Sequence, residues 1–303
     1  MAPTDSDLWS DWLLRRRQAG DADYRRQVQA EVAAIAERVI DGARLAPGMT
    51  LADVGSGEGV VVWRAFERVG PTLAAIVTDI SQPLLDHARE QARERGVLDR
   101  CRFLADSAER LDGIADASVD ALTMRAVLAY VGDKAAAMRE AWRVLKPGGR
   151  LSIAEPILRG EALKAAALRR LVEAQPPGAR DRFMELMLRW KSAQFPATDE
   201  AIAASPLAGH DERDLLRLAQ RAGFAPLHLE LHIDVRPSKV PNWQVFLGVA
   251  PHPWAPSLGE LFEREFDADE RMLLEQVLRP TIDSGQGLSE DPIAYLQAVK
   301  PAA

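Results

Sequence analysis

The stretch Leu51-Ala-Asp-Val-Gly-Ser-Gly-Glu-Gly59 decides the fold of this chain. Residues 50–54 form a short apolar run typical of a buried strand, and Gly55, Gly57 and Gly59 follow it directly. Glycine has no Cβ, so a strand that ends in this way and opens a helix lets its backbone approach a ligand closely. We therefore predict a strand, a ligand-binding turn and a helix in this order.

The same alternation of strands and helices continues on both sides of this stretch. Apolar runs that predict strands lie at 73–77, 102–105, 119–124, 150–154, 227–235 and 242–249. Helical periodicity predicts helices at 22–46, 82–95, 133–145 and 211–223. Strands joined by crossover helices give a parallel sheet that is covered on both faces. We therefore predict an α/β fold, a doubly wound, Rossmann-like mixed sheet of seven strands.

Two acidic residues follow the next two predicted strands. Asp79 ends the second strand, where its carboxylate is placed to accept hydrogen bonds from a ribose diol, and Asp106 follows the third strand, where adenine recognition is often placed. In open α/β sheets, ligands bind in the crevice outside the carboxyl ends of the strands. The glycine turn and these two acids therefore predict one nucleoside-binding site, although a solvated acid at a strand end is the simpler alternative for each.

The composition indicates a globular chain with few kinds of partner. The 303 residues include 38 Lys and Arg against 45 Asp and Glu, a formal net charge of −7, which argues against nucleic acid and anionic membranes as partners. Cys101 is the single cysteine, so neither an intramolecular disulfide nor a cysteine-rich metal site can form. No run reaches the roughly 18–20 apolar residues of a membrane span, and the acidic N-terminus has no signal-peptide core. We expect a cytoplasmic protein.

These motifs resemble the class I S-adenosylmethionine-dependent methyltransferases. The glycine stretch has the family's acid-x-Gly-x-Gly-x-Gly form, beginning at Asp53. Residues 143–151 (RVLKPGGRL) resemble the family's segment leading into the fifth strand, and residues 119–128 resemble its fourth strand and following loop. The likeness covers residues 30–155 closely and 210–250 loosely, and is greatest to the subgroup of ubiquinone and menaquinone C-methyltransferases and other small-molecule enzymes.

The resemblance implies S-adenosylmethionine as the cofactor and assigns its contacts. The turn at 55–57 would lie under the methionine part, Asp79 would hold the ribose, and Ile80 would pack on the adenine. Asp106 and Ser107 would contact the adenine rim. The full set of implied cofactor-binding residues is Asp53, Gly55, Ser56, Gly57, Asp79, Ile80, Asp106, Ser107 and Arg125.

The catalytic assignments are less constrained by the sequence. Arg125 follows the fourth strand, where it could clamp a substrate carboxylate or phosphate, or form an ion pair with Glu155. Glu155 is a candidate base or hydrogen-bond acceptor, and Tyr130 lies one turn beyond Arg125. The Asn/Asp-Pro-Pro-aromatic motif of nucleobase methyltransferases is absent, which favours a small-molecule acceptor.

Two other functions compete with this interpretation. A nicotinamide dehydrogenase has two residues between its second and third glycines, whereas Glu58 alone separates Gly57 from Gly59 here. A non-catalytic S-adenosylmethionine-binding or regulatory protein would share every cofactor motif. We expect methyl transfer to O, N or C of a small molecule, and the sequence leaves a homodimer open.

The resemblance also divides the chain into functional segments. We predict N-terminal helices covering the site over 1–46, a cofactor-binding core over 47–155, a helical lid insertion over 156–209, the rest of the core over 210–250, and a helical C-terminal extension over 251–303. The run Arg15-Arg16-Arg17 is interpreted as a solvated helix face. No metal site is expected, because His228 and His232 lie about 13 Å apart along a strand, too far for one metal to bind both.

Overall fold

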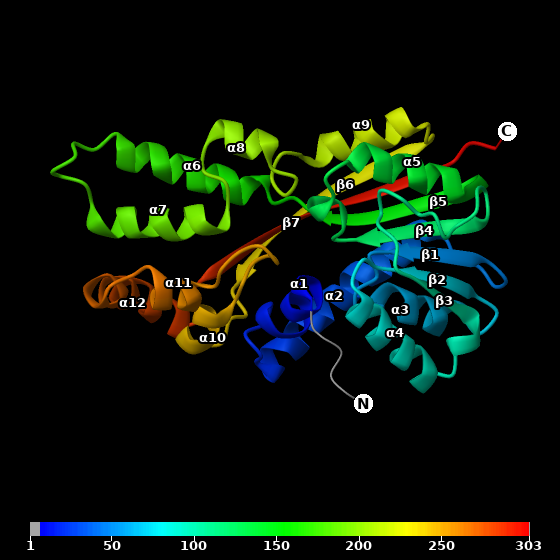
Figure 1. Cartoon of the computed structure of the whole chain (residues 1–303), viewed down its shortest axis with the longest axis horizontal. Coiled ribbons are helices and arrows are strands. Elements are labelled where there is room, and N and C mark those ends of the chain that lie inside the picture. The colour runs from blue at the N-terminus through cyan, green and yellow to red at the C-terminus, as the bar shows by residue number, and fades with distance from the viewer. Residues whose placement is uncertain (1–6, 303) are drawn as a thin grey trace.

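The computed structural model describes residues 7–302, and over this range the strands form one mixed seven-stranded sheet in the order β3-β2-β1-β4-β5-β7-β6 (Figure 1). Strands β1 to β5 pair in parallel, whereas β7 pairs antiparallel with both β5 and β6. The predicted doubly wound, Rossmann-like sheet is confirmed. The strands are β1 Thr50–Val54, β2 Ala74–Thr78, β3 Cys101–Leu104, β4 Val119–Arg125, β5 Leu145–Pro156, β6 Leu227–Pro237 and β7 Leu288–Val299.

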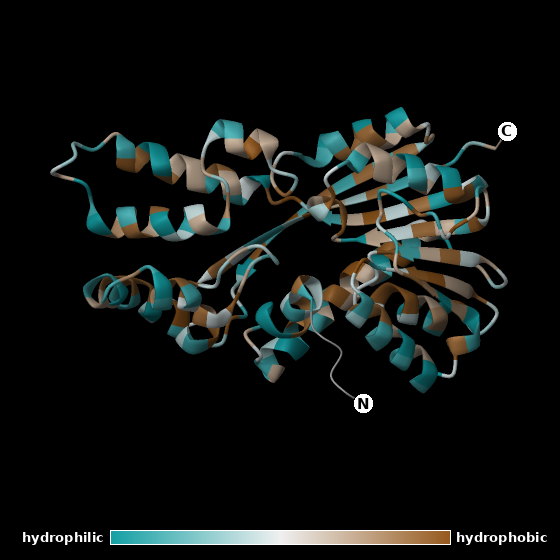
Figure 2. Ribbon diagram, in the orientation of Figure 1, coloured by the Kyte–Doolittle hydropathy of each residue, from teal (hydrophilic) through white to brown (hydrophobic). Residues whose placement is uncertain are grey.

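Helices cover both faces of this sheet and bury an apolar cluster on each. Figure 2 shows apolar residues along the strands and on parts of the helices beside them. One cluster joins the sheet to α2 (Ala22–Ala43), α3 (Val60–Val69) and α4 (Gln82–Glu94), and the other joins it to α5 (Lys134–Val144) and α9 (Glu212–Ala222). The result is a three-layer α/β/α core, with β1 between β2 and β4 at the point where the chain changes direction across the sheet.

The remaining helices lie beyond the carboxyl ends of the parallel strands. The long strands β6 and β7 run out of the sheet toward them (Figure 1). An apolar cluster packs α7 against α10, α11 and α12, and a second one joins α6 to α8. These elements are α6 Arg159–Glu173, α7 Arg182–Gln194, α8 Asp199–Ala204, α10 Trp243–Gly248, α11 Leu258–Arg264 and α12 Ala268–Asp283. Short turns complete the described chain: α1 Leu8–Asp11, η1 Trp12–Arg16, η2 Leu98–Arg100 and η3 Leu128–Tyr130.

The predicted strand over 242–249 is wrong, because these residues form helix α10. Asn242 caps the helix by accepting a hydrogen bond from the Val245 N–H at 2.9 Å, and Trp243 and Val245 are buried against the neighbouring helices. A short apolar run of this length is compatible with either a strand or a buried helix turn.

The seventh strand lies instead at the end of the segment predicted to be helical. Residues 251–303 contain α11 and α12, as expected, but then form β7, which occupies the position between β5 and β6. Proline is found mainly on the edge strands of a sheet, whereas Pro292 lies inside β7, between two other strands. For this reason the sequence did not indicate a strand here. The Pro292 carbonyl accepts a hydrogen bond from the Ile157 N–H at 2.9 Å just beyond β5. None of the helices over residues 7–302 combines the length and apolarity of a membrane span.

Lys300, directly after β7, holds the C-terminal end of α5 in place. Its ammonium group donates to the carbonyls of Trp142 and Leu145 at 2.8 and 2.7 Å, and lies 3.9 Å from the centre of the Trp142 ring. The last carbonyls of a helix have no partner within the helix and carry partial negative charge. The buried cation therefore joins the last strand of the sheet to one of its covering helices.

We expect Lys300→Met to lower the free energy of unfolding by about 1–3 kcal/mol, because the substitution leaves two buried carbonyls without a donor. Urea unfolding followed by circular dichroism measures this. Arg139→Met is the matched control, because Arg139 lies on α5, the helix that Lys300 contacts, and its side chain is 64% exposed. We expect this substitution to change the free energy of unfolding by less than about 0.5 kcal/mol. Equal effects of the two substitutions would contradict the assigned role of Lys300.

Candidate functional site

The glycine turn after β1 has the backbone geometry that only glycine adopts easily. Gly55 and Gly57 have φ angles of +62° and +55°. A Cβ on Gly55 would lie 2.6 Å from the Val127 side chain, and one on Gly57 would lie 3.0 Å from Leu13. Residues other than glycine are therefore disfavoured at both positions, by the positive φ angle and by the lack of space for a Cβ. The backbone without side chains faces the carboxyl end of the sheet.

Asp79, at the end of β2, joins that turn to the neighbouring strand. Its carboxylate accepts hydrogen bonds from the Gly57 N–H at 2.8 Å and the Ser81 N–H at 2.9 Å. Burial raises the pKa of Asp79 above its ordinary value, and the two backbone N–H groups act against that shift. Each carboxylate oxygen has a second lone pair, so this acid keeps acceptor capacity for a ligand.

A cavity of about 480 Å³ lies against the turn and Asp79, within the usual range for small-molecule sites. We call it the first cavity. Asp106 borders it and accepts a hydrogen bond from the Gly113 N–H at 3.0 Å, while the Ile80 side chain is 54% exposed beside it. The predicted residues that the structure brings together here are Gly55, Gly57, Asp79, Ile80, Asp106, Ser107, Arg125 and Tyr130.

Two predicted cofactor residues, Asp53 and Ser56, do not border this cavity. Asp53 is buried and accepts a 2.6 Å hydrogen bond from the Thr123 hydroxyl. Burial raises the pKa of Asp53 to about 7, against the opposing effects of Thr123 and nearby Arg125. The Ser56 hydroxyl is buried and has no hydrogen-bond partner within residues 7–302.

Glu155, one of the predicted catalytic residues, is fully buried at the end of β5. Its carboxylate accepts three backbone hydrogen bonds, from the N–H groups of Val127, Leu128 and Ala129 at 3.1, 3.0 and 2.7 Å. Burial raises the pKa of Glu155 to about 7, and these three N–H groups oppose the shift. The expected alternative of an ion pair with Arg125 is wrong, because the Glu155 oxygens accept from backbone N–H groups and its charge acts on Arg125 only from beyond 4.0 Å. Glu155 instead fixes the turn that follows β4.

Tyr130 lies at the end of that turn within a group of aromatic rings. It makes edge-to-face contacts with Trp9, Trp254 and Trp12, with ring centres 5.3, 5.6 and 6.3 Å apart. Burial raises the pKa of Tyr130 to about 12, so the phenol stays protonated at neutral pH. Trp9 and Trp12 also line the first cavity, and Trp254 from the C-terminal segment packs on Trp9 and Tyr130.

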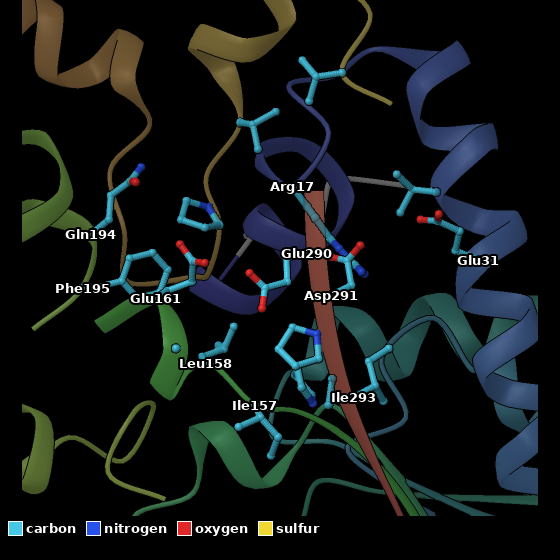
Figure 3. A pocket seen from close by; sticks show the side chains of 18 of the residues that line it. Arg17, Glu31, Ile157, Leu158, Glu161, Gln194, Phe195, Glu290, Asp291 and Ile293 are labelled. Atoms are coloured by element: carbon cyan, nitrogen blue, oxygen red, sulfur yellow. The ribbon is translucent and has the colours of Figure 1, made fainter. Parts of the chain in front are cut away.

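A second cavity, of about 470 Å³, adjoins the first (Figure 3). Its walls come from α2, α6, α7, α10 and the ends of β5 and β7, and Figure 3 shows Ile157, Leu158, Phe195 and Ile293 lining it. Both cavities share one set of bordering residues, which we call the junction: Arg17, Arg125, Ala126, Pro156, Leu158, Pro251 and Asp291.

Two charged residues of the junction, Arg17 and Asp291, are not predictable as site residues from the sequence. Arg17 was assigned to a solvated helix face, and this is wrong, because its side chain borders both cavities. Its neighbour Arg16 is also engaged, since it donates to Glu260 at 2.8 Å, whereas Arg15 is exposed. Asp291 lies on β7, the strand that the sequence did not predict. Triplets of arginine give no signal of which member turns inward.

Within residues 7–302, no cluster of three or more His, Cys, Asp or Glu is arranged to hold a metal ion. On β6, Glu230 hydrogen bonds to His228 and His232 at 3.1 and 2.8 Å and to Arg38 at 2.8 Å. These side chains form a polar network on β6.

Comparison with known proteins supports the geometry. The chain is 34% identical over 116 residues to a ubiquinone/menaquinone biosynthesis C-methyltransferase of Idiomarina loihiensis; the match covers 38% of this chain and 46% of that enzyme, less than half its length. The YcgJ protein of Bacillus subtilis has the same fold, with a TM-score of 0.53 and 17% identity over 89% of this chain and 99% of that one. The cyclase SpnF also shares it, at 0.50 and 21% over 91% and 83%.

A family model described as a methyltransferase domain matches residues 45–223, which run from the helix before β1 to the end of α9. This match includes the glycine turn, Asp79, Asp106, Arg125 and Glu155 and covers more than half of the 303 residues. The chain therefore belongs to the methyltransferase domain family, and the predicted membership of the class I S-adenosylmethionine-dependent methyltransferases is confirmed.

Proposed function

We propose that this protein transfers a methyl group from S-adenosylmethionine to an O, N or C atom of a small organic molecule held in the second cavity. The observation that carries the proposal is the pair of adjoining cavities. One has the glycine turn and Asp79 on its wall, and the other is largely apolar. The fold alone is insufficient support, since it also serves a cyclase.

The first cavity fits S-adenosylmethionine on observations of this chain. Gly55 and Gly57 have positive φ angles and border the cavity without side chains, so their bare backbone is open to close approach by a ligand. Asp79 supplies unused acceptor capacity on the wall of the cavity, and the Ser56 hydroxyl, in the same turn but outside the cavity, has no hydrogen-bond partner within residues 7–302. In this proposal Asp79 holds the ribose, Ile80 packs on the adenine, and Asp106 with Ser107 contacts its rim.

The bound cofactor supplies an electrophilic sulfonium methyl group, so the protein's main task is to place a nucleophile in line with it. Placement of this kind can contribute about 7–11 kcal/mol to lowering the barrier. We assign it to the junction. Arg125 orients the acceptor there, and Tyr130, which stays protonated, donates a hydrogen bond.

Glu155 acts in this proposal as a positioning residue for the turn that bears Tyr130. All three of its hydrogen bonds go to backbone N–H groups, and it has no exposed surface from which to reach an acceptor. Asp291 is better placed as proton acceptor, because it borders both cavities and burial raises its pKa. This assignment applies where the acceptor loses a proton.

We further propose that the helices over 156–209 act as a lid for the second cavity. Trp190, Gln194 and Phe195 of this segment line it, and α10 and α11 contribute Phe246 and Leu258 from the opposite side. A closed apolar chamber excludes water from the reacting atoms. The net charge of −7 supports a small-molecule acceptor over nucleic acid.

The experiment that tests the function is turnover with a panel of small acceptors, read as formation of S-adenosylhomocysteine. We expect product with at least one class of acceptor. Binding of S-adenosylhomocysteine without turnover of any acceptor would favour the alternative, a non-catalytic binding or regulatory protein. Absence of binding would contradict both.

Asp79→Ala should weaken the binding of S-adenosylhomocysteine by about tenfold or more, since each charge-assisted hydrogen bond contributes about 1.5–3 kcal/mol. Isothermal titration calorimetry measures the change. Asp99→Ala is the matched control, because that side chain is 79% exposed, far along the chain from the turn. Asp79→Asn keeps one acceptor oxygen and tests whether loss of folding explains the effect. Unchanged affinity in Asp79→Ala would remove this residue from the site.

Glu155 generates a prediction about pH. Its pKa in the folded protein, about 7, lies above the ordinary value of 4.5, so its contribution to stability is present below pH 4.5 and is lost as pH rises through 7. Relative to Glu155→Gln, the wild type should therefore lose on the order of 1–3 kcal/mol of unfolding free energy between pH 5 and pH 8. Urea unfolding of both proteins measures the difference, in which other titrating groups cancel. If the wild type instead gained unfolding free energy relative to Glu155→Gln between pH 5 and pH 8, the three N–H groups would outweigh burial in setting the pKa of Glu155.

A further inference from the structure

Two arginine side chains from separate elements meet at the junction of the cavities. Arg17 directly follows η1 and Arg125 ends β4, and both border the first cavity, the second cavity and a third one of about 390 Å³ beside α2 and α3. Burial lowers the pKa of each guanidinium, and Arg17 lowers the pKa of Arg125 further, to about 10. Both remain cationic at neutral pH.

Carboxylates act on these two charges only from a distance: Glu58 and Glu31 on Arg17, and Asp53, Glu58 and Glu155 on Arg125. Within residues 7–302, neither side chain donates a hydrogen bond or forms an ion pair within 4.0 Å, and Arg17 lies only over the Trp12 ring. The acids that act on Arg125 are held by other donors. Asp53 is bonded to Thr123, Glu58 to Arg25, and Glu155 to three backbone N–H groups.

Among the other cations of the second cavity, Lys164 and Arg236 form ion pairs, whereas the Lys191 ammonium group lies over the Trp190 ring, 4.1 Å from its centre. Lys164 bonds to Glu161 and Glu290 at 2.9 and 2.8 Å, and Arg236 bonds to Glu31 at 3.0 Å. The rest of the wall is mainly apolar, with side chains from α2, α7, α10, β7 and the segment after β5: Val28, Val32, Ile35, Ile157, Leu158, Phe195, Phe246 and Ile293. Within residues 7–302, the cations of this cavity without an ion pair are therefore Arg17 and Arg125 at the junction and Lys191 on α7.

The two guanidiniums border the same cavities and repel each other, and an anion bound by both would relieve this repulsion. Guanidinium groups bind carboxylate and phosphate through paired N–H donors, and two of them can grip one such group. Asp291 does not serve this purpose, since it lies beyond 4.0 Å of both guanidiniums and accepts a hydrogen bond from the Ser289 hydroxyl. Both guanidiniums therefore keep N–H donors free for an anionic ligand at the junction.

We propose that the methyl acceptor carries an anionic group, a carboxylate or a phosphate, which Arg17 and Arg125 bind at the junction while its apolar body fills the second cavity. The word acceptor rests on the function proposed above, whereas the anion site stands on the two arginines alone. The anionic group fixes one end of the molecule beside the first cavity and so orients the nucleophilic atom.

The test uses the full chain saturated with S-adenosylhomocysteine and four probes: octanoate, octyl phosphate, inorganic phosphate and the neutral octan-1-ol. Calorimetric titration gives the affinity for each. We expect octanoate or octyl phosphate to bind at least about tenfold more tightly than octan-1-ol, and the stronger of the two tells carboxylate from phosphate. Inorganic phosphate should compete with the preferred probe.

The same titrations on Arg17→Gln and Arg125→Gln should reduce the preference for the anion by about tenfold or more in each variant. Arg15→Gln, which removes an exposed charge from the same run, is the matched control and should keep it. Arg17→Lys keeps the charge without the fork of donors and should recover part of the affinity.

Equal affinity of the wild type for octanoate, octyl phosphate and octan-1-ol, or an anion preference that survives both glutamine substitutions, would overturn the proposal. Absence of binding by all four probes would also count against it. The proposed function is read separately, because S-adenosylhomocysteine is titrated alone beforehand. Its failure to bind would refute the function, whereas binding without an anion preference would refute only this inference.

Discussion

The site depends on one hydrogen bond, from the Gly57 N–H to the Asp79 carboxylate. It joins the turn after β1 to the end of β2, so the two strands that flank the crevice present one continuous polar edge. The turn that carries this N–H requires glycine, because Gly55 and Gly57 have positive φ angles and a Cβ on Gly55 would lie 2.6 Å from the Val127 side chain. An acid buried there is costly unless its oxygens find donors, and backbone N–H groups supply them.

A second constraint sets the back of the site. The Glu155 carboxylate accepts hydrogen bonds from the backbone N–H groups of residues 127–129. These bonds fix the turn after β4, which ends at Tyr130. The aromatic rings of Trp9, Trp12 and Trp254 then pack around Tyr130 from opposite ends of the chain. The N-terminal helices and the C-terminal segment thus close one chamber, although more than 200 residues separate them.

The core could be predicted from the sequence because its information is local. Each motif is contained within about ten residues: the strand that ends in glycines, the acid after the next strand, and the Pro-Gly-Gly turn. Accordingly, β1, β4 and α5 lie close to their predicted positions. The second cavity was not predictable in this way. Its walls come from α2, α6, α7, α10 and β7, and β7 contains a proline and begins with polar residues. The position of Arg17 and Asp291 at the junction becomes apparent only when these elements are assembled.

The proposed function requires that the first cavity binds the nucleoside part of the cofactor, that the second cavity binds the methyl acceptor, and that the two meet at the junction beside Arg125. The most direct test is a crystal structure with S-adenosylhomocysteine. The account predicts its ribose against Asp79, its adenine against Ile80, and its sulfur facing the junction of the two cavities. Density with the sulfur turned away from Arg125, or no ligand between the glycine turn and Asp79, would contradict it.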